Sequence, residues 1–185
     1  VQWMTGGIVP PRSAARPLMQ RAGTRERVLE AARAHPRAKA ALDTWIAKAD
    51  AALKREFVIP ELRHGYSGNY ACSEHQCLLV PDPVNYRHRC PKGNHEVVGN
   101  LAADKAVALI VHTRNSEDCA ALGWAYHLTG KEAYAGKAAE ILSAYAAQYP
   151  GWDYANKESL GLWSRVAHAV LGECWWIHGM VEGYD

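Results

Sequence analysis

Cysteine and histidine residues are concentrated in the segment YACSEHQCLLVPDPVNYRHRCPKGNH, residues 70–95, which holds three of each. Thiolate sulfur and imidazole nitrogen are common zinc ligands in proteins, and a structural site takes four ligands in a tetrahedron. Two pairs at short spacing, one C-x2-H and one C-x4-H, would each close a small chelate, and the loop between them would bring the pairs together. This pattern favours a structural zinc site. The predicted ligands are Cys72, His75, Cys90 and His95, with Cys77 as a substitute.

Two other states of the loop thiols remain open from the sequence. A disulfide would pair two of Cys72, Cys77 and Cys90, and it would fit a protein that works in an oxidising compartment, although three is an odd number. Free thiols in a packed loop are the third alternative. The remaining cysteines, Cys119 and Cys174, fall in helical sequence and are expected to be buried small apolar residues.

Basic and aromatic side chains in the same loop and in the last helical stretch are suited to an acidic sugar chain. Arginine can grip a carboxylate through two parallel hydrogen bonds, and the face of a sugar can lie on an aromatic ring. Steps of three and seven residues return to nearly the same helix face, which would place Arg165 and His168 beside Trp175. The alternative is that the loop carries ordinary surface cations and that the tryptophans are core residues. The candidates for substrate binding are Tyr70, Arg87, His88, Arg165, His168 and Trp175.

Apolar residues recur at helical spacing on both sides of the loop. Proline and glycine mark the helix ends, because the residue before proline avoids the helical region and glycine suits the C-cap. Residues 1–24 show no helical or strand period and are predicted to be an extended lead-in. The predicted helices are residues 24–35, 37–57, 101–129, 131–149 and 159–183, with a break near Asn115 in the third.

Residues 58–99 form a long irregular excursion in which only CLLV, residues 77–80, resembles a strand. Loops of this length in a compact domain are usually functional or pinned by cross-links, because ordering them is entropically costly. Consecutive helices with short connectors and little strand signal predict an all-α domain over residues 25–185. We expect antiparallel helix hairpins that carry one long irregular Cys/His loop.

Bulk composition excludes some classes of partner. The 185 residues suit one domain, and a hydrophobic fraction of 49% with 22% charged residues is ordinary for a globular protein. A formal net charge of +2 indicates no broad basic surface, so we expect no nucleic-acid partner. The sequence contains no run of about 18 apolar residues, so no membrane-spanning helix is predicted.

Three segments resemble the N-terminal helical domain of the heparinase II/III-like polysaccharide lyases, a family that includes alginate and oligoalginate lyases. They are WIAKADAALKREFVIPE, GYSGNYACSEHQCLLVPDPVNYRHRCP and ALGWAYHLTGKEAYAGKAAEILSAYAAQYP. The resemblance implies an incomplete (α/α) toroid over residues 25–185, in a chain that we expect to be truncated at both ends. It departs from the family after Cys90 and Pro91, where some relatives have a second cysteine and this chain does not.

The resemblance also implies an activity. Such lyases cleave uronic-acid polysaccharides, such as alginate or a glycosaminoglycan, by β-elimination, in the periplasm or outside the cell and without a cofactor for catalysis. A tyrosine and a histidine act as base and acid, and an asparagine faces the substrate carboxylate. By the family's order these residues are expected beyond Asp185, so no catalytic residue is assigned here and the chain alone is expected to be inactive.

Two other functions remain open. A glycoside hydrolase on an (α/α) toroid would need two inward carboxylates that bracket the scissile bond, and a zinc-stabilised helical module could bind a carbohydrate or a protein without catalysis. Glu173 lies among apolar residues and is expected to form an ion pair with another helix, whereas His112 and His127 are expected to be packed histidines with satisfied hydrogen bonds. The candidate carboxylates are Asp104, Glu117, Asp118, Asp153 and Glu173.

Overall fold

The computed structural model of the protein describes residues 23–155 and 164–185, and most of these residues are helical. The all-α prediction is therefore confirmed. Most of the predicted lead-in and the first five residues of the predicted last helix lie outside the described residues. The helices are α1 (Thr24–Ala34), α2 (Pro36–Lys54), α3 (Leu101–Thr129), α4 (Glu132–Gln148) and α5 (Val170–Tyr184).

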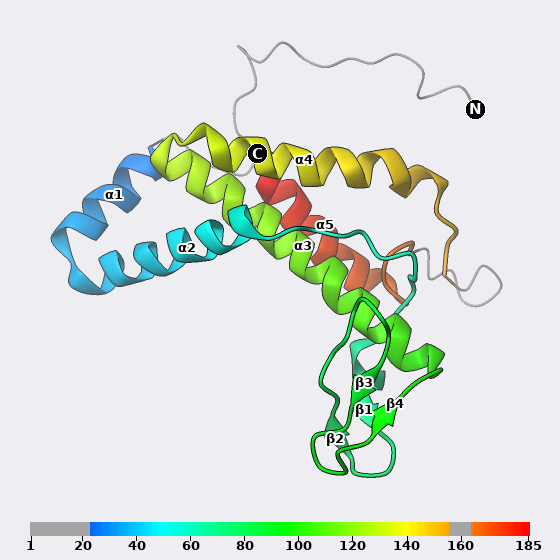
Figure 1. The fold of residues 1–185 in the computed structure, drawn as a ribbon. Helices are drawn as coiled ribbons and strands as arrows, with labels where there is room; N and C mark the ends of the chain where they lie inside the picture. The colour runs from blue at the N-terminus through cyan, green and yellow to red at the C-terminus, as the bar shows by residue number, and fades with distance from the viewer. Residues whose placement is uncertain (1–22, 156–163) are drawn as a thin grey trace, which may run out of the picture.

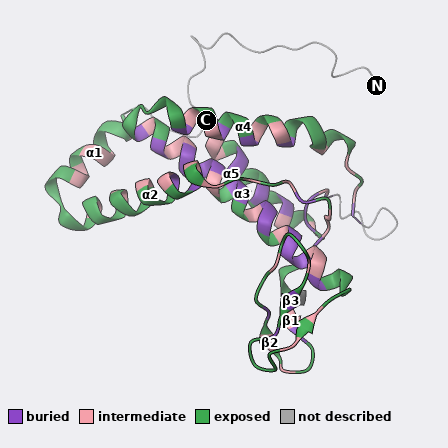
Figure 2. Ribbon diagram, in the orientation of Figure 1, coloured by how far each residue is buried: buried purple, intermediate pink, exposed green. Residues whose placement is uncertain are grey.

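The long helix α3 is the centre of the fold, and α2, α4 and α5 all pack on it (Figure 1). Its N-terminus is capped by Asn100, whose side chain accepts hydrogen bonds from the backbone N–H groups of Ala102 and Ala103. At the other end Gly130 takes the left-handed conformation with φ of 73°, as the sequence predicted for the C-cap. The distribution of buried residues agrees with this arrangement. Buried residues occur along α3, whereas α1 has none (Figure 2).

The predicted break of α3 near Asn115 is wrong. The helix runs through this polar stretch because the buried Asn115 amide finds partners on other segments. It donates to the carbonyl of Val58 at 2.9 Å and to the hydroxyl of Tyr145 at 2.9 Å. His112 belongs to the same network, with its Nδ1 2.8 Å from the Tyr145 hydroxyl. Tertiary partners therefore satisfy side chains that looked like helix breakers in the sequence.

Small residues let α3 and α5 approach closely. A Cβ added at Gly123 would lie 2.8 Å from the Cα of Gly183, and one at Gly179 would collide with Ser116. Ser116 uses this closeness to donate a hydrogen bond to the carbonyl of Trp176 at 2.5 Å. The contact fixes α5 on the central helix.

The predicted last helix begins later than expected, because α5 starts at Val170. Arg165 and His168 therefore lie in the preceding non-helical segment, and the prediction that they share a helix face with Trp175 is wrong. This segment is held by a parallel bridge between Gly65 and Ala167. The carbonyl of Val166 and the N–H of His168 form hydrogen bonds with His64 and Gly65, so these two groups do not take part in helical hydrogen bonds.

The loop between α2 and α3 is more regular than predicted. It contains two antiparallel hairpins, which we call the hairpin pair, formed by residues 71–78 and 88–97. The predicted strand at residues 77–80 matches β2 in part, and the other three strands were not predicted. Two short 3-10 turns, η1 (Ser67–Asn69) and η2 (Tyr149–Gly151), complete the elements. The strands are β1 (Ala71–Cys72), β2 (Cys77–Leu78), β3 (His88–Arg89) and β4 (Glu96–Val97).

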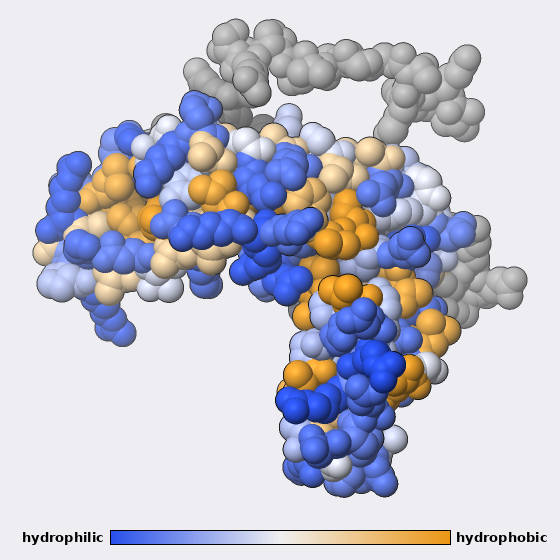
Figure 3. All heavy atoms as spheres, in the orientation of Figure 1, coloured by the Kyte–Doolittle hydropathy of each residue, from blue (hydrophilic) through white to orange (hydrophobic). Residues whose placement is uncertain are grey.

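The hairpin pair sits at the N-terminal end of α3 (Figure 1), and a small apolar cluster joins the two. Its tip is mostly hydrophilic on the face drawn in Figure 3. No helix in residues 23–155 and 164–185 combines the length and the apolar character needed to cross a bilayer.

Candidate metal centre

The two hairpins are built alike around a cysteine. In the first, Cys72 ends β1, and Gln76 takes a positive φ of 48° just before β2. In the second, Cys90 follows β3, and Asn94 takes the same positive φ of 48° just before His95. Each turn therefore has a cysteine in its first position and a left-handed residue in its fifth. In each turn the cysteine and the histidine that follows it are close in sequence, and both side chains lie in the space between the two hairpins.

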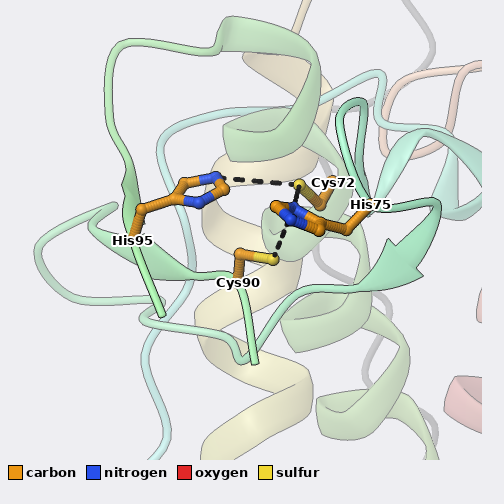
Figure 4. A group of neighbouring side chains, drawn as sticks. All are labelled: Cys72, His75, Cys90 and His95. Carbon is orange, nitrogen blue, oxygen red and sulfur yellow. Dashed lines mark hydrogen bonds between the residues drawn. The ribbon is translucent and has the colours of Figure 1, made fainter. Parts of the chain in front are cut away.

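The four predicted ligands converge between the hairpins, as Figure 4 shows. The Cys72 sulfur lies 3.6 Å from His75 Nδ1 and 3.7 Å from His95 Nε2, and the Cys90 sulfur lies 3.6 Å from His75 Nδ1. All four ligand atoms lie within 4.8 Å of one another. Both cysteines are buried and both histidines are partly exposed. This group of two sulfur and two nitrogen donors could hold a metal ion.

The structure contains no disulfide. All five cysteines of the chain are free, and the sulfurs of Cys77 and Cys90 lie 3.7 Å apart. A disulfide bond requires about 2.05 Å. Cys77 lies outside the four-residue group. Cys119 is buried as expected, and burial raises the pKa of its thiol to about 12, whereas Cys174 is exposed, contrary to expectation.

Gly93 is a part of the site that the sequence analysis missed. It occupies the fourth position of the second turn, where the first turn has His75. A Cβ at Gly93 would lie 2.6 Å from His95 Nδ1 and closer still to His75 Cε1. Its backbone N–H also donates to the Cys90 sulfur at 3.3 Å. The absence of a side chain at Gly93 therefore leaves room for both imidazole rings. In the sequence, the position of this glycine between Cys90 and His95 in CPKGNH was the signal that could have indicated its role.

Behind the cluster, a buried chain of hydrogen bonds ties the hairpin pair to α3. The Tyr70 hydroxyl is 3.0 Å from His88 Nδ1, and His88 Nε2 is 2.9 Å from a carboxylate oxygen of Asp104. Since a carboxylate only accepts, a neutral His88 donates from Nε2 and accepts from the tyrosine at Nδ1. Burial, with smaller contributions from Asp82 and Asp104, raises the pKa of Tyr70 to about 12.

The substrate-binding candidates fall in several environments rather than one. Tyr70 and His88 are 4% and 0% exposed, so in this structure they belong to the interior. Arg87 is exposed and forms an ion pair with Glu96. On α5, Trp175 is 70% exposed.

Arg165 and His168 lie near each other in the chain but have different surroundings. The Arg165 guanidinium donates to the carbonyls of Tyr149 and Pro150 at 2.6 and 2.5 Å and to the Tyr154 hydroxyl at 2.9 Å, so its donors bind the protein itself. His168 is exposed, and its ring centroid lies 5.3 Å from that of Tyr66.

Glu173 is buried as expected, but its partners are not an ion pair on another helix. One carboxylate oxygen accepts from the backbone N–H groups of Val166 and Ala167 at 2.8 and 3.1 Å. The other accepts from the Tyr149 hydroxyl at 2.7 Å. These bonds hold the segment before α5 in a non-helical conformation and explain the late start of that helix.

The two packed histidines differ. His112 is fully buried with both ring nitrogens near partners, as predicted. His127 Nε2 is buried without a hydrogen bond, so the prediction of a satisfied ring is wrong for it.

The chemistry of the centre therefore rests on its own residues and their distances. Two thiols, two imidazoles and a glycine that clears the space for them come from two similarly built turns. No protein-family model, curated protein or solved structure matches the chain.

Proposed function

We propose that Cys72, His75, Cys90 and His95 bind a structural Zn²⁺ ion. We also propose that the chain is the N-terminal part of an (α/α) toroid in a lyase that cleaves an acidic polysaccharide in the periplasm or outside the cell. The observation that carries the metal proposal is the convergence of the four side chains. The lyase proposal is supported by the resemblance of three segments to the heparinase II/III-like lyases.

The distances between ligand atoms fit zinc. A tetrahedral ion with zinc–sulfur bonds of about 2.3 Å and zinc–nitrogen bonds of about 2.0–2.1 Å separates sulfur from nitrogen by about 3.6 Å. Three of the four sulfur–nitrogen distances in the cluster are 3.6, 3.7 and 3.6 Å, and all four ligand atoms lie within 4.8 Å of one another. Three of the six ligand–ligand distances of the proposed tetrahedron thus match the length expected for zinc.

The number of ligands favours a structural role for the ion. Catalytic zinc sites keep one position open for water or substrate, whereas structural sites use four protein ligands. Here one cysteine and one histidine come from each hairpin, so a bound ion would cross-link two turns whose own strands are only two residues long. Bound zinc would stabilise the hairpin pair and would take no part in catalysis.

An exposed apolar stripe on α5 supports the toroid proposal. Leu171, Trp175 and Val181 are 61%, 70% and 42% exposed, and their spacing puts them on one side of the helix. Apolar patches of this kind usually mark a surface that another element covers. In a toroid, helix hairpins pack side by side, and this stripe is suited to the next one.

The hydrolase alternative receives less support from the carboxylates. Asp104 is bonded to His88, Asp118 forms an ion pair with Arg55, and Glu173 is saturated by backbone and tyrosine donors. Three of the five candidates thus already have structural partners. A retaining or inverting pair needs carboxyl groups facing the substrate.

Native mass spectrometry tests the metal proposal. We expect the mass of the chain plus one zinc ion, and loss of the ion in Cys90→Ser. Cys174→Ser is the matched control, because Cys174 is exposed on α5, and this variant should keep the zinc. A mass lower by two hydrogens would indicate a disulfide instead, and an unmodified mass would indicate free thiols.

The lyase proposal is tested on the complete natural protein with alginate, heparin and heparan sulfate. β-Elimination produces an unsaturated uronate that absorbs ultraviolet light, whereas hydrolysis produces new reducing ends without that absorbance. We expect the absorbance to rise with one of these polymers. Reducing ends without absorbance would support the hydrolase, and no cleavage at all would support the binding module.

A further inference from the structure

A short backbone segment crosses α3 beside the hairpin pair. The N–H of His64 donates to the carbonyl of Val166 at 2.8 Å, and the N–H of His168 donates to the carbonyl of Gly65 at 3.1 Å. A Cβ at Gly65 would lie 2.6 Å from the carbonyl carbon of Lys105, so only glycine allows this approach to the helix. The residues on both sides of Gly65 are thereby fixed against the start of α3.

A surface cavity of about 380 Å³ opens at this crossing. The exposed ring of Tyr66, at 55%, forms one wall, and His168 lies against that ring with a centroid distance of 5.3 Å. The ring itself lies over η1, where a Cβ at Gly68 would be 2.6 Å from Tyr66 Cε1. The residues that line the cavity are His64, Tyr66, Leu101, Ala102 and Lys105.

The backbone of His64 is held in an uncommon conformation. Its φ is 64°, in the left-handed region that residues with a side chain seldom adopt. The side chain is tied by a hydrogen bond between Nε2 and the carbonyl of Asp153 at 3.0 Å. Backbone conformations of this kind cluster at binding sites, where the surrounding structure enforces them.

Of the five lining residues, only Lys105 carries a permanent charge, which is positive. Among the described residues, no carboxylate forms an ion pair with Lys105. The pKa of His64 is lowered, first by burial and further by the positive charges of Arg63 and Lys105, although its hydrogen bond to Asp153 opposes this. The carboxylates of Asp104 and Glu173 are not among the lining residues, and they accept hydrogen bonds from His88 and from backbone N–H groups, respectively.

We propose that this cavity is a subsite for one acidic sugar residue, in which the Tyr66 ring stacks on the sugar face and Lys105 binds its anionic group. The imidazole of His64 lines the same cavity, and that of His168 lies against the Tyr66 ring. An exposed ring beside an unpaired ammonium group matches a pyranose that carries a carboxylate or a sulfate. The inference rests on the proposed function for the identity of the polymer, and it adds the position in this chain at which one sugar residue binds.

Calorimetric titration of the chain with three tetrasaccharides tests the subsite. The probes are a mannuronate tetramer, a heparin tetrasaccharide and a neutral glucose tetramer. We expect at least one acidic tetramer to bind at least tenfold more tightly than the neutral one. Preference for the first shows that a carboxylate alone is sufficient, and preference for the second, which carries both carboxylates and sulfates, shows that sulfate contributes to binding.

Matched variants locate the binding. Tyr66→Ala and Lys105→Ala should each weaken binding of the acidic tetramer at least tenfold. The controls Tyr126→Ala and Lys54→Ala remove the same kinds of side chain at other exposed positions and should leave it unchanged. Amide NMR shifts on titration should map to residues 64–66 and 101–105, which requires no variant.

Three results would overturn the subsite. They are equal binding of the neutral tetramer, unchanged affinity in both cavity variants, and no binding of either acidic tetramer at millimolar concentration. None of these decides the lyase proposal, which depends on the unsaturated product of the complete protein. A positive lyase assay with unchanged cavity variants would show that the polymer binds elsewhere.

Discussion

Replacing Gly93 by alanine should damage the metal centre without removing a ligand. The added Cβ would lie 2.6 Å from His95 Nδ1 and closer to His75 Cε1, whereas carbon atoms in contact prefer about 3.5–4.0 Å. At least one ring must therefore move by roughly 1 Å. A metal site tolerates displacements of only about 0.2 Å in its bond lengths.

The metal-bound state should suffer more than the metal-free state, because a free histidine ring can rotate away from the new methyl group and a coordinated ring cannot. Changing a residue that positions the ligands of a metal typically costs about 10–100-fold in affinity. We expect a loss of that size, which corresponds to about 1.4–2.8 kcal/mol of binding free energy. Competition for Zn²⁺ against a chromophoric chelator measures it directly.

Gly136→Ala is the matched control. This glycine lies within α4, and a Cβ there meets nothing within 4 Å. It should leave zinc affinity unchanged and raise the free energy of unfolding by about 1 kcal/mol, because alanine is the better helix former. If Gly93→Ala bound zinc as tightly as the unmodified chain, the tetrahedral arrangement argued for the four ligands would be wrong.

Three further predictions concern stability. Removing zinc with a chelator should expose the amides of the hairpin pair to hydrogen exchange while those of α3 stay protected, because the helix has its own packing; equal loss in both would contradict a local role. In denaturant titrations, Tyr145→Phe should lower the free energy of unfolding by about 1–3 kcal/mol, because it leaves His112 Nδ1 buried without a partner. The control Tyr126→Phe, at an exposed site, should change this free energy by less than about 0.5 kcal/mol. Burial lowers the pKa of His112 from 6.5 to about 4, so between these values the unfolded chain binds a proton that the folded chain does not, and stability should fall by about 3 kcal/mol as the pH decreases through this window. His112→Gln should flatten this dependence in unfolding measured at each pH, and an unchanged slope would exclude His112 as its source.

Helices α1 to α4 were predictable because apolar periodicity, proline and glycine act within one or two turns. Their positions agree with the observed helices to within a few residues. The start of α5 was not predictable, because Glu173 and the crossing at Gly65 stabilise a non-helical segment where the local pattern still favours helix. The continuity of α3 through Asn115 was not predictable either, because the hydrogen-bond partners of this side chain are distant in sequence.

The sequence alone determined which side chains could bind a metal, because ligand chemistry and short-range chelate spacing belong to the residues themselves. Only the tertiary structure decided that the two turns face each other and that Gly93 clears their shared space. It also buried Tyr70 and His88 under α3 and left Tyr66 and Lys105 around an open cavity. Exposure depends on which segments pack against a residue, and these segments lie far from it along the chain.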